Sequence, residues 1–268
     1  MGKVALIQMN SSSRVEDNLQ LAESLLIQAT QNHAQLAVLP ENFSQMPLTE
    51  KQRLQAAEEP GNGPIQGFLS TISSKLNLWI IAGTISIKTD SENKVFSSCL
   101  TYDNNGKCQA RYDKQHLFDV DLANGESYRE SSFIKHGKQL KFVDTPVGRI
   151  GLSICYDLRF PEYFRLLSQQ NVQILSVPAA FTHTTGLAHW EALLQARAIE
   201  NLCYVIAPAQ TGTHDNGRTT YGHSVAFDPW GKRIALLEHG NGVVYAQIDL
   251  NYLNEVRQQI PCLKHRRM

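Results

Sequence analysis

The sequence predicts an α/β fold in which mixed sheets pack together with helices on the outside. Near the N-terminus, a buried strand, an amphipathic helix and a second buried strand follow one another, which is how a parallel α/β unit begins. Further along the chain, the Asn105-Gly106 step lies between two strand-like segments and marks a hairpin. Because the chain combines parallel crossovers with hairpins, we expect mixed sheets.

The first α/β unit places an acidic side chain at the end of a buried strand. Residues 4–9 are apolar, and Ser13-x-x-Glu16 has the pattern of a capping box that opens a helix. Residues 36–39 form the next buried strand, and Pro40 ends it just before Glu41. The carboxyl ends of strands in such sheets face the ligand crevice, so we expect Glu41 to lie there.

The remaining elements continue the alternation of strands and helices. We expect helices over residues 65–76, 161–169 and 186–201, a hairpin over residues 142–150, and strands over residues 78–85, 95–102, 174–177, 204–209, 224–227, 233–237 and 243–248. Residues 113–139 lack a clean period and carry many polar groups. A loop of that length in a compact domain usually has a function.

The composition is ordinary for a soluble globular protein and favours small-molecule chemistry. The chain has 268 residues, of which 42% are hydrophobic and 19% charged, and we expect one domain over residues 1–268. Lys and Arg together number 25, as do Asp and Glu, so no net charge attracts nucleic acid or an anionic membrane. We therefore expect a small-molecule partner, and neither nucleic acid nor membrane.

The cysteine content and the N-terminus indicate a cytoplasmic protein. The five cysteines include no Cys-x-x-Cys pair, which argues against a disulfide framework and against a thiolate zinc site. The apolar run after Met1 is broken by Gln8 and is too short for a signal peptide. No segment approaches the roughly 18 to 20 apolar residues that cross a bilayer.

Cys155, Glu41 and Lys114 are the candidates for reactive chemistry. Cys155 follows a strand and precedes a helix that begins at Pro161, and a thiol near a helix N-terminus has a lowered pKa. Burial at a strand end should raise the pKa of Glu41 toward the range of a general base. Considered singly, each residue has a more common structural explanation: a cysteine packed in the core, a glutamate in an exposed loop, and a lysine solvated in a loop.

Three segments that together supply a base, a cation and a nucleophile carry a family resemblance. They are Leu39-Pro40-Glu41-Asn42-Phe43, Tyr112-Asp113-Lys114-Gln115-His116-Leu117-Phe118 and Cys155-Tyr156-Asp157-Leu158-Arg159-Phe160-Pro161-Glu162. The chain resembles the nitrilase, or carbon-nitrogen hydrolase, superfamily with its Glu-Lys-Cys triad. The resemblance implies a four-layer αββα sandwich and amide hydrolysis through a cysteine thioester. Cys155 would be the nucleophile, Glu41 the base, and Lys114 with the Tyr156 N–H the oxyanion site.

The resemblance also implies a second catalytic glutamate in the segment after Lys114. Two Glu-Ser steps are candidates, Glu126-Ser127 and Glu130-Ser131. The spacing fits Glu130 better. Its role would be to orient Lys114 and to share the acid-base work.

A narrower resemblance concerns the substrate. Residues 176–191, 195–201 and 221–224 are similar to the Nit branch, which contains deaminated glutathione amidases and ω-amidases, and residues 207–212 and 218–224 look more like the former. The resemblance implies hydrolysis of deaminated glutathione to α-ketoglutarate and cysteinylglycine. An ω-amidase that acts on α-ketoglutaramate, another carbon-nitrogen hydrolase such as a carbamoylase or nitrilase, and a non-catalytic binding protein are the alternatives.

The acyl half of the substrate requires a cation. Both amides would leave an α-ketoglutaryl group on the nucleophile, and Arg159 is the candidate that binds its carboxylate. A structural ion pair of Arg159 with Glu162 or Asp157 is the alternative. Phe181 and Thr182 follow the next strand end and are candidates for the acyl pocket.

Residues 211–220, with His214 and Arg218, are candidates for the leaving-group side, and an exposed loop arginine is the alternative for Arg218. Four histidines lie within a short stretch, but their spacings match no zinc signature, so we expect no metal and no other cofactor. They are His183, His189, His214 and His223. No histidine segment resembles that of a papain-like protease. The family resemblance implies a homodimer.

Overall fold

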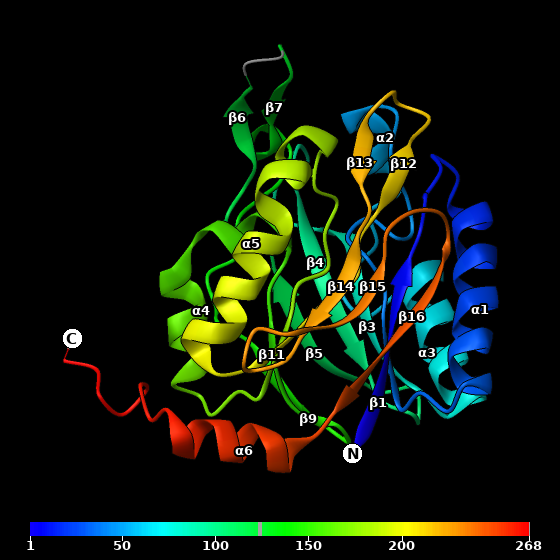
Figure 1. The fold of residues 1–268 in the computed structure, drawn as a ribbon. Coiled ribbons are helices and arrows are strands. Elements are labelled where there is room, and N and C mark those ends of the chain that lie inside the picture. Colours follow the sequence, from blue (N-terminus) through cyan, green and yellow to red (C-terminus); the bar gives the residue numbers. More distant parts are fainter. Residues whose placement is uncertain (123–124, 268) are drawn as a thin grey trace.

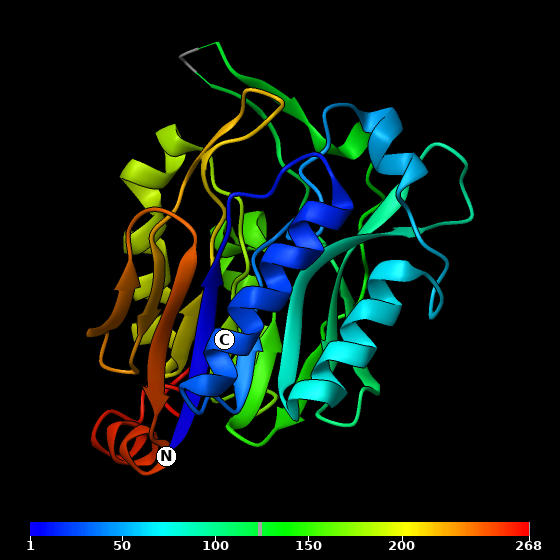
Figure 2. The same cartoon turned by 90° about the vertical axis from the view of Figure 1, so that its right-hand side faces the viewer.

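Two six-stranded mixed sheets, packed face to face, form the centre of the protein (Figure 1). The computed structural model describes residues 1–122 and 125–267. Helices cover the outer face of each sheet, as the side view in Figure 2 also shows. The prediction of a four-layer αββα sandwich is therefore confirmed.

The first sheet has parallel strands at its centre and antiparallel strands toward its edges. In order across the sheet, its strands are β16 (Gly242–Ile248), β1 (Gly2–Gln8), β2 (Leu36–Val38), β3 (Trp79–Lys88), β4 (Val95–Tyr102) and β5 (Cys108–Asp113). β1, β2 and β3 are parallel, and the other neighbours pair antiparallel. The turn at Gly106 joins β4 to β5, as the Asn-Gly step predicts.

The second sheet repeats this arrangement. In order, its strands are β15 (Arg233–Leu237), β14 (Ser224–Phe227), β11 (Tyr204–Ala207), β10 (Ile174–Ser176), β9 (Gly148–Leu152) and β8 (Phe142–Thr145). β9, β10 and β11 are parallel, and the outer strands are antiparallel to their neighbours. The predicted hairpin over residues 142–150 corresponds to β8 and β9.

Helices form the two outer layers. α1 (Val15–Gln31) and α3 (Pro64–Leu76) cover the first sheet, and α4 (Pro161–Ser168) and α5 (His183–Asn201) cover the second. Two further helices, α2 (Glu50–Gln55) and α6 (Leu250–Gln259), are absent from the sequence prediction. In the part of the chain that the structure describes, no helix has both the length and the apolar character needed to cross a membrane.

The alternation of side chains along β1 explains why this strand has a layer on each side. Val4 and Leu6 pack in the core between the two sheets, whereas Ala5 and Ile7 pack in the core beneath α1 and α3. All four are fully buried. Successive side chains of a strand point to opposite faces, so a strand that is apolar at every position requires cover on both.

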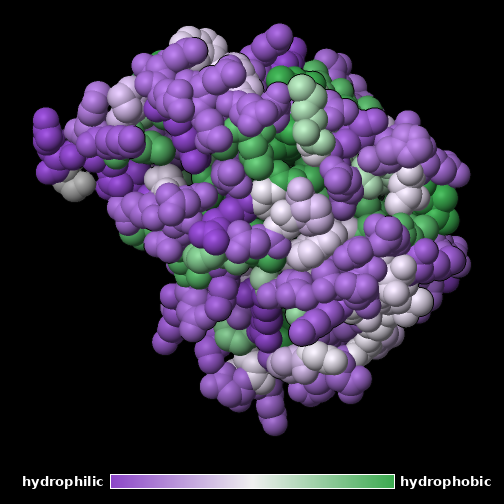
Figure 3. Space-filling view, turned by 90° about the horizontal axis from the view of Figure 1, so that it is seen from below, coloured by the Kyte–Doolittle hydropathy of each residue, from purple (hydrophilic) through white to green (hydrophobic). Residues whose placement is uncertain are grey.

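Two hairpins project beyond one end of the sandwich (Figure 1). One consists of β6 (Asp119–Asp121) and β7 (Ser127–Arg129), and the other of β12 (Thr211–Thr213) and β13 (Thr219–Tyr221). The segments read as loops, residues 113–139 and 211–220, therefore each contain a short two-stranded hairpin that the sequence analysis did not predict. At the opposite end, where α6 lies, the surface is mostly hydrophilic with scattered apolar residues (Figure 3).

The predicted capping box at the start of α1 does not form. The Ser13 hydroxyl and backbone N–H both donate to Asp215 Oδ2 at 2.7 Å, so the hydroxyl is not available to the helix. α1 begins after Arg14 without a side-chain cap. α5 begins earlier than predicted, because the Thr182 hydroxyl accepts from Thr185 N and caps the helix.

The side chain of Asp157 links the segment that follows β5 to the segment that follows β9. Its carboxylate is completely buried and accepts from Tyr112 Oη at 2.7 Å, from Ile154 N at 2.8 Å and from His116 N at 3.1 Å. His116 Nδ1 lies 2.7 Å from Asp157 Oδ1. Burial and the charge of Asp157 raise the pKa of Tyr112, which therefore stays a hydrogen-bond donor.

We predict that Asp157→Asn destabilises the fold. An amide has one acceptor oxygen in place of two, and it turns an N–H group toward at least one of these donors. A buried donor left unsatisfied costs about 1 to 3 kcal/mol, so the free energy of unfolding in denaturant should fall by that amount. The control is Asp144→Asn, at an exposed acid paired with Arg149. If both variants unfold like the wild type, the Asp157 network does not hold these strand ends together.

Candidate active site

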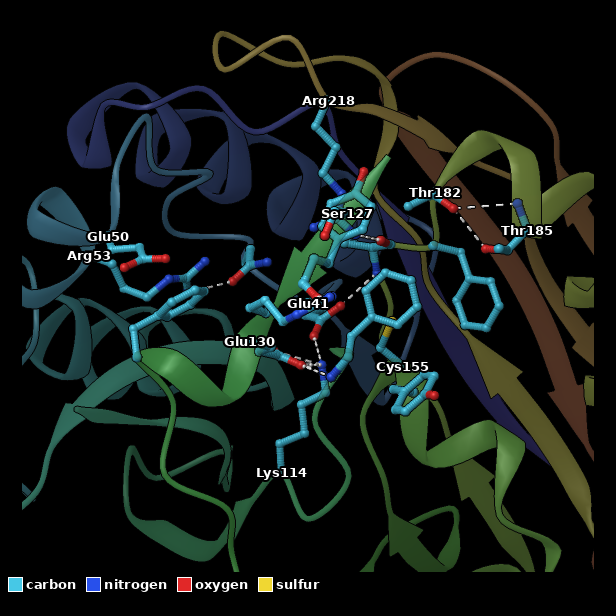
Figure 4. A pocket seen from close by; sticks show the side chains of 18 of the residues that line it. Glu41, Glu50, Arg53, Lys114, Ser127, Glu130, Cys155, Thr182, Thr185 and Arg218 are labelled. Atoms are coloured by element: carbon cyan, nitrogen blue, oxygen red, sulfur yellow. Dashed lines mark hydrogen bonds and ion pairs between the residues drawn. The ribbon is translucent and has the colours of Figure 1, made fainter. Parts of the chain in front are cut away.

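Three strand ends bring the predicted reactive side chains together at the end of the sandwich that carries the hairpins. Glu41 follows β2, Lys114 follows β5 and Cys155 follows β9. Figure 4 shows Glu41, Lys114 and Glu130 pointing toward one another, with Cys155 beside them. All four line one cavity.

Lys114 is the centre of a buried charge cluster. Its Nζ donates to Glu41 Oε1 at 2.8 Å and approaches both carboxylate oxygens of Glu130 at 2.9 Å. The side chains of Lys114 and Glu41 are 2% and 5% exposed, so their charges interact strongly through a medium of low dielectric constant. These contacts occupy the three N–H donors of the ammonium group.

The charge cluster keeps Glu41 and Lys114 ionised. Burial alone would raise the pKa of Glu41, but the charge and the hydrogen bond of Lys114 outweigh it and hold the pKa below its usual 4.5. Burial opposes the charge on Lys114 as well, but Glu130 and Glu41 raise its pKa above the usual 10.5. The prediction of a raised pKa for Glu41 is therefore wrong, because it considered burial without the ammonium.

Cys155 is held as a neutral thiol. Burial, together with the charge of Glu41, raises its pKa well above the usual 9.0, and the charge of Lys114 only partly opposes this. The prediction of a lowered thiol pKa is therefore wrong. Cys155 begins a 3-10 helix (Cys155–Arg159) and does not lie at the N-terminus of α4. The charge of Glu41 acts on the thiol, and both side chains border the same cavity, so a base is available for the thiol proton.

The backbone at Cys155 is strained. Its φ is 47°, in the left-handed region that residues other than glycine seldom adopt. Such a conformation costs roughly 1 to 3 kcal/mol and persists only where surrounding structure enforces it. Cys155 N donates to Pro178 O at 3.0 Å, and the Asp157 carboxylate holds the preceding residue, Ile154. These contacts turn the thiol toward Glu41.

Contacts from distant parts of the chain hold Glu41, and no local sequence pattern predicts them. Ala180 N donates to Glu41 Oε2 at 2.9 Å, and Gln210 Nε2 donates to the Glu41 carbonyl at 3.0 Å. Gly83 on β3 lies against the preceding residue, and a Cβ there would come within 2.1 Å of Pro40 O. Glycine is therefore required for this close approach of two backbones.

The structure brings Glu130, and not Glu126, to Lys114. Besides the two contacts with Lys114 Nζ, Glu130 Oε2 accepts from Phe118 N at 2.7 Å. Glu126 instead accepts from Tyr128 Oη at 2.9 Å on the projecting hairpin. The preference for Glu130 over Glu126, which the sequence analysis based on spacing after Lys114, thus agrees with the geometry of the cluster.

The cluster opens into a cavity of about 220 Å³. Aromatic rings form one wall: Phe118 lies 5.1 Å from the ring of Tyr128 and 5.1 Å from that of Tyr156. Thr182 lines the cavity but also caps α5, and Phe181 lines it while packing against Trp190 at 4.8 Å. Both predicted acyl-pocket residues therefore border the same space as Cys155.

Arg159 also borders the cavity. In the described part of the chain its guanidinium forms no ion pair with Glu162 or Asp157, and Asp157 is bonded elsewhere. The guanidinium lies over the rings of Phe181 and Tyr156, with its central carbon 5.4 Å and 5.8 Å from their centroids, and its Nη1 lies 3.3 Å from His189 Nδ1. The structure therefore does not support the alternative that Arg159 forms a structural ion pair with either acid.

The two candidates from residues 211–220 have different environments. Arg218 borders the cavity, lies over the ring of Tyr128 and donates to the carbonyl of Ala180. His214 is buried away from it, with Nδ1 2.9 Å from Ser11 O and Nε2 2.8 Å from Thr220 Oγ1. Burial lowers the pKa of His214. The prediction that His214 belongs to the leaving-group side is therefore wrong.

Arg53 and Tyr128 border the cavity without having been predicted. Arg53 comes from the six-residue helix α2, which has no buried residue and hence no apolar period to reveal it. Tyr128 comes from β7 within the segment predicted to be a loop. Among the residues that the structure describes, no three His, Cys, Asp or Glu side chains gather in a way that could hold a metal ion.

Comparisons with known proteins agree with this geometry. The family model of the carbon-nitrogen hydrolases matches residues 3–258. The protein named deaminated glutathione amidase from Synechocystis is 43% identical over 265 residues, which cover 98% of this chain and 97% of the relative. A protein of the same name from Yersinia enterocolitica is 41% identical, with coverage of 98% and 92%.

Solved structures show the same fold. The NitFhit protein of Caenorhabditis elegans superposes with a TM-score of 0.93 at 39% identity, covering 99% of this chain and 65% of that protein. Nit3 of Saccharomyces cerevisiae, described as a member of branch 10 of the nitrilase superfamily, gives a TM-score of 0.89 at 30% identity, with coverage of 100% and 97%. The chain belongs to the carbon-nitrogen hydrolase family and is an amidase.

Proposed function

We propose that this amidase hydrolyses deaminated glutathione to α-ketoglutarate and cysteinylglycine. The main support for this proposal is a buried Glu-Lys-Cys cluster that borders a cavity. Three arginines that have no carboxylate partner within the described chain border the same cavity: Arg53, Arg159 and Arg218. Such a cavity suits an amide with a carboxylate on each side of the scissile bond. Relatives at about 40% identity that carry the name deaminated glutathione amidase support the same choice.

In the acylation step, Cys155 Sγ attacks the amide carbon while Glu41 takes the thiol proton. The thiol is neutral and its pKa is raised by burial and by the charge of Glu41, so proton transfer to Glu41 accompanies attack and no free thiolate is needed. The carbonyl oxygen becomes an oxyanion. When it collapses, the C–N bond breaks and Glu41 gives the proton to the departing amine, which leaves a thioester on Cys155.

Lys114 and the Tyr156 N–H stabilise the oxyanion. In the resting site the N–H donors of Lys114 are directed at Glu41 and Glu130. Once Glu41 is protonated, it attracts the ammonium less, so one donor becomes free for the oxyanion at the moment when that charge forms. Glu130 keeps Lys114 in position during this exchange.

In the deacylation step, water is the nucleophile and Cys155 is the leaving group. Glu41, again a carboxylate, takes a proton from water while the water oxygen attacks the thioester carbon. The C–S bond then breaks, and Cys155 recovers its proton from Glu41. The product is α-ketoglutarate.

Arg159 is the proposed site for the α-keto carboxylate of the acyl group. It lies beside Phe181, and Thr182 contributes to the same wall of the cavity. A guanidinium forms two parallel hydrogen bonds to a carboxylate, which fixes the acyl group relative to Cys155. Arg218 is proposed for the leaving-group side.

An ω-amidase that acts on α-ketoglutaramate is the second candidate. The cavity next to Cys155 has a volume of about 220 Å³, which is below the usual range for drug-sized ligands and suits a small primary amide. The two candidates share the acyl half and differ only in the leaving group.

A cytoplasmic homodimer is part of the proposal. Large apolar side chains are exposed on α4, on α5 and in the turn before β15: Leu166, Leu187, Ile199 and Trp230. Burying such a surface between two copies would stabilise association. All five cysteines are free thiols, which fits a reducing compartment. A monomeric mass in sedimentation equilibrium would contradict the dimer, and recovery of the protein outside the cytoplasm on cell fractionation would contradict the location.

We predict a higher kcat/KM for deaminated glutathione than for α-ketoglutaramate when amine release from the first and ammonia release from the second are measured side by side. Cys155→Ser should abolish both activities and keep the circular dichroism spectrum of the wild type. The opposite preference would assign the chain to the ω-amidases. Activity retained by Cys155→Ser would contradict the thioester mechanism.

We predict that kcat/KM stays on a plateau from neutral pH down to the acid side. Glu41 works in its deprotonated form, and its pKa lies below the usual 4.5, so the base is lost only as the pH falls below that value. Acid stability of the fold is checked over the same range by circular dichroism. An acid limb centred above 4.5, in protein that is still folded, would show that Lys114 does not hold the pKa of Glu41 down.

We predict that Arg159→Met lowers kcat/KM for both amides by similar factors, roughly 10- to 100-fold, because a charge-assisted hydrogen bond is lost and the apolar stem remains. Arg149→Met, at a half-buried residue that is paired with Asp144 and does not border the cavity, is the control. An effect on only one of the two amides would place Arg159 on the leaving-group side.

A further inference from the structure

Arg53 and Arg218 are two neighbouring cations whose hydrogen-bonding capacity is largely unused. Arg53 Nη1 donates to Asn42 Oδ1 at 3.2 Å, and its guanidinium lies over the ring of Phe133. Arg218 Nη2 donates to the Ala180 carbonyl, while its Nε is buried and has no partner among the described residues. A guanidinium has five donors in a planar fork, so most of them remain available in both residues.

No carboxylate directly neutralises either guanidinium. In the described chain, neither forms an ion pair within 4.0 Å. Burial lowers the pKa of Arg53, the charges of Glu130 and Glu41 oppose this, and the charge of Arg218 adds to the lowering, so the two cations, which border the same cavity, repel each other. Of the acids whose charges act on Arg53, Glu130 and Glu41 are already bonded to Lys114, and Glu50 lies on the same helix without an ion pair to Arg53 in the described chain. An anion held by both guanidinium groups would relieve this repulsion.

The two arginines lie where the catalytic cavity meets a second hollow. The inner cavity, of about 220 Å³, contains Cys155 and Lys114. The outer hollow, of about 580 Å³, contains neither. Six residues border both spaces: Glu50, Arg53, Ser127, Tyr128, Phe133 and Arg218. Figure 4 shows Arg53 and Arg218 reaching the pocket from different sides, with Glu41, Glu130 and Lys114 below them in the view.

We propose that Arg53 acts with Arg218 to bind a carboxylate on the leaving amine, so that the enzyme selects amides whose amine half ends in a carboxylate. Arg159, beside Phe181 and Tyr156, serves the acyl half. The inner cavity holds the acyl group and the scissile bond. The leaving amine extends past Tyr128 toward the outer hollow, and its carboxylate lies at the junction. This specificity rests on the proposed function, because it concerns the amine half of the same substrate.

Arg53 is the more informative of the two residues to replace. Arg218 donates to the carbonyl of Ala180, and the N–H of Ala180 donates to Glu41, so replacing Arg218 also disturbs the base. Arg53 comes from α2 and donates to the side chain of Asn42, the residue after Glu41, but makes no hydrogen bond to Glu41 or to Ala180 in the described chain. Arg53→Met keeps an unbranched apolar side chain and removes the charged group together with its hydrogen bond to Asn42. The matched control is Lys51→Met, which removes one positive charge from the exposed face of the same helix.

The kinetic test compares deaminated glutathione with the same molecule in which the C-terminal carboxylate is a neutral amide. The wild type and Lys51→Met should prefer the carboxylate form. Arg53→Met should lower kcat/KM for the carboxylate form by about 10- to 100-fold and leave the neutral form nearly unchanged, so the preference disappears. An unchanged preference in Arg53→Met would overturn the proposal, even if deaminated glutathione is the substrate.

A binding test separates this proposal from the proposed function. Calorimetry with the Cys155→Ser variant measures the affinity for the same two molecules without turnover. If the wild type hydrolyses neither molecule, but Cys155→Ser binds the carboxylate form more tightly and loses that preference with Arg53→Met added, the specificity stands and the function fails. If Cys155→Ser binds both forms equally, or binds neither, the proposed carboxylate site is wrong.

Discussion

The contact of the Lys114 ammonium with two carboxylates, deep at the end of the sandwich, is the interaction on which the site depends. Desolvation disfavours the buried charges of Lys114 and Glu41, and the attraction between opposite charges in the cluster outweighs it. The same cluster determines the protonation state of Cys155. Burial and the negative charge of Glu41 both destabilise a thiolate and raise the pKa of the thiol. The nucleophile is therefore activated by proton transfer during attack and not by a lowered pKa.

The scaffold serves this cluster by bringing strand ends from two sheets to one place. β2 and β5 belong to the first sheet and β9 to the second, so the face-to-face packing of the sheets determines the distances between the reactive groups. Asp157 joins the segments that carry Lys114 and Cys155 through buried hydrogen bonds. The same end of the sandwich carries α2 and the hairpin of β12 and β13, which supply Arg53 and Arg218 to the border of the cavity. Stability and specificity are thus built by different parts of the chain.

Local sequence patterns predicted mixed sheets with helices outside and the positions of Glu41 and Cys155, because strand ends can be recognised from an apolar run and a following proline or turn. The four-layer sandwich followed from the family resemblance. The local patterns failed where a partner lies far along the chain. The pKa of Glu41 depends on Lys114, 73 residues away, and the Ser13 hydroxyl is taken by Asp215, 202 residues away. Arg53 was missed because α2 is short and buries no residue of its own.

The protonation state of Cys155 tests the account most directly. The thiolate absorbs in the ultraviolet, and the difference in absorbance between the wild type and Cys155→Ser isolates this one residue during a pH titration. The account predicts no thiolate signal at neutral pH and its appearance only in alkaline solution, above the usual cysteine pKa of 9.0. A thiolate that is already present at neutral pH would contradict the account, because the nucleophile would then be activated before the substrate arrives.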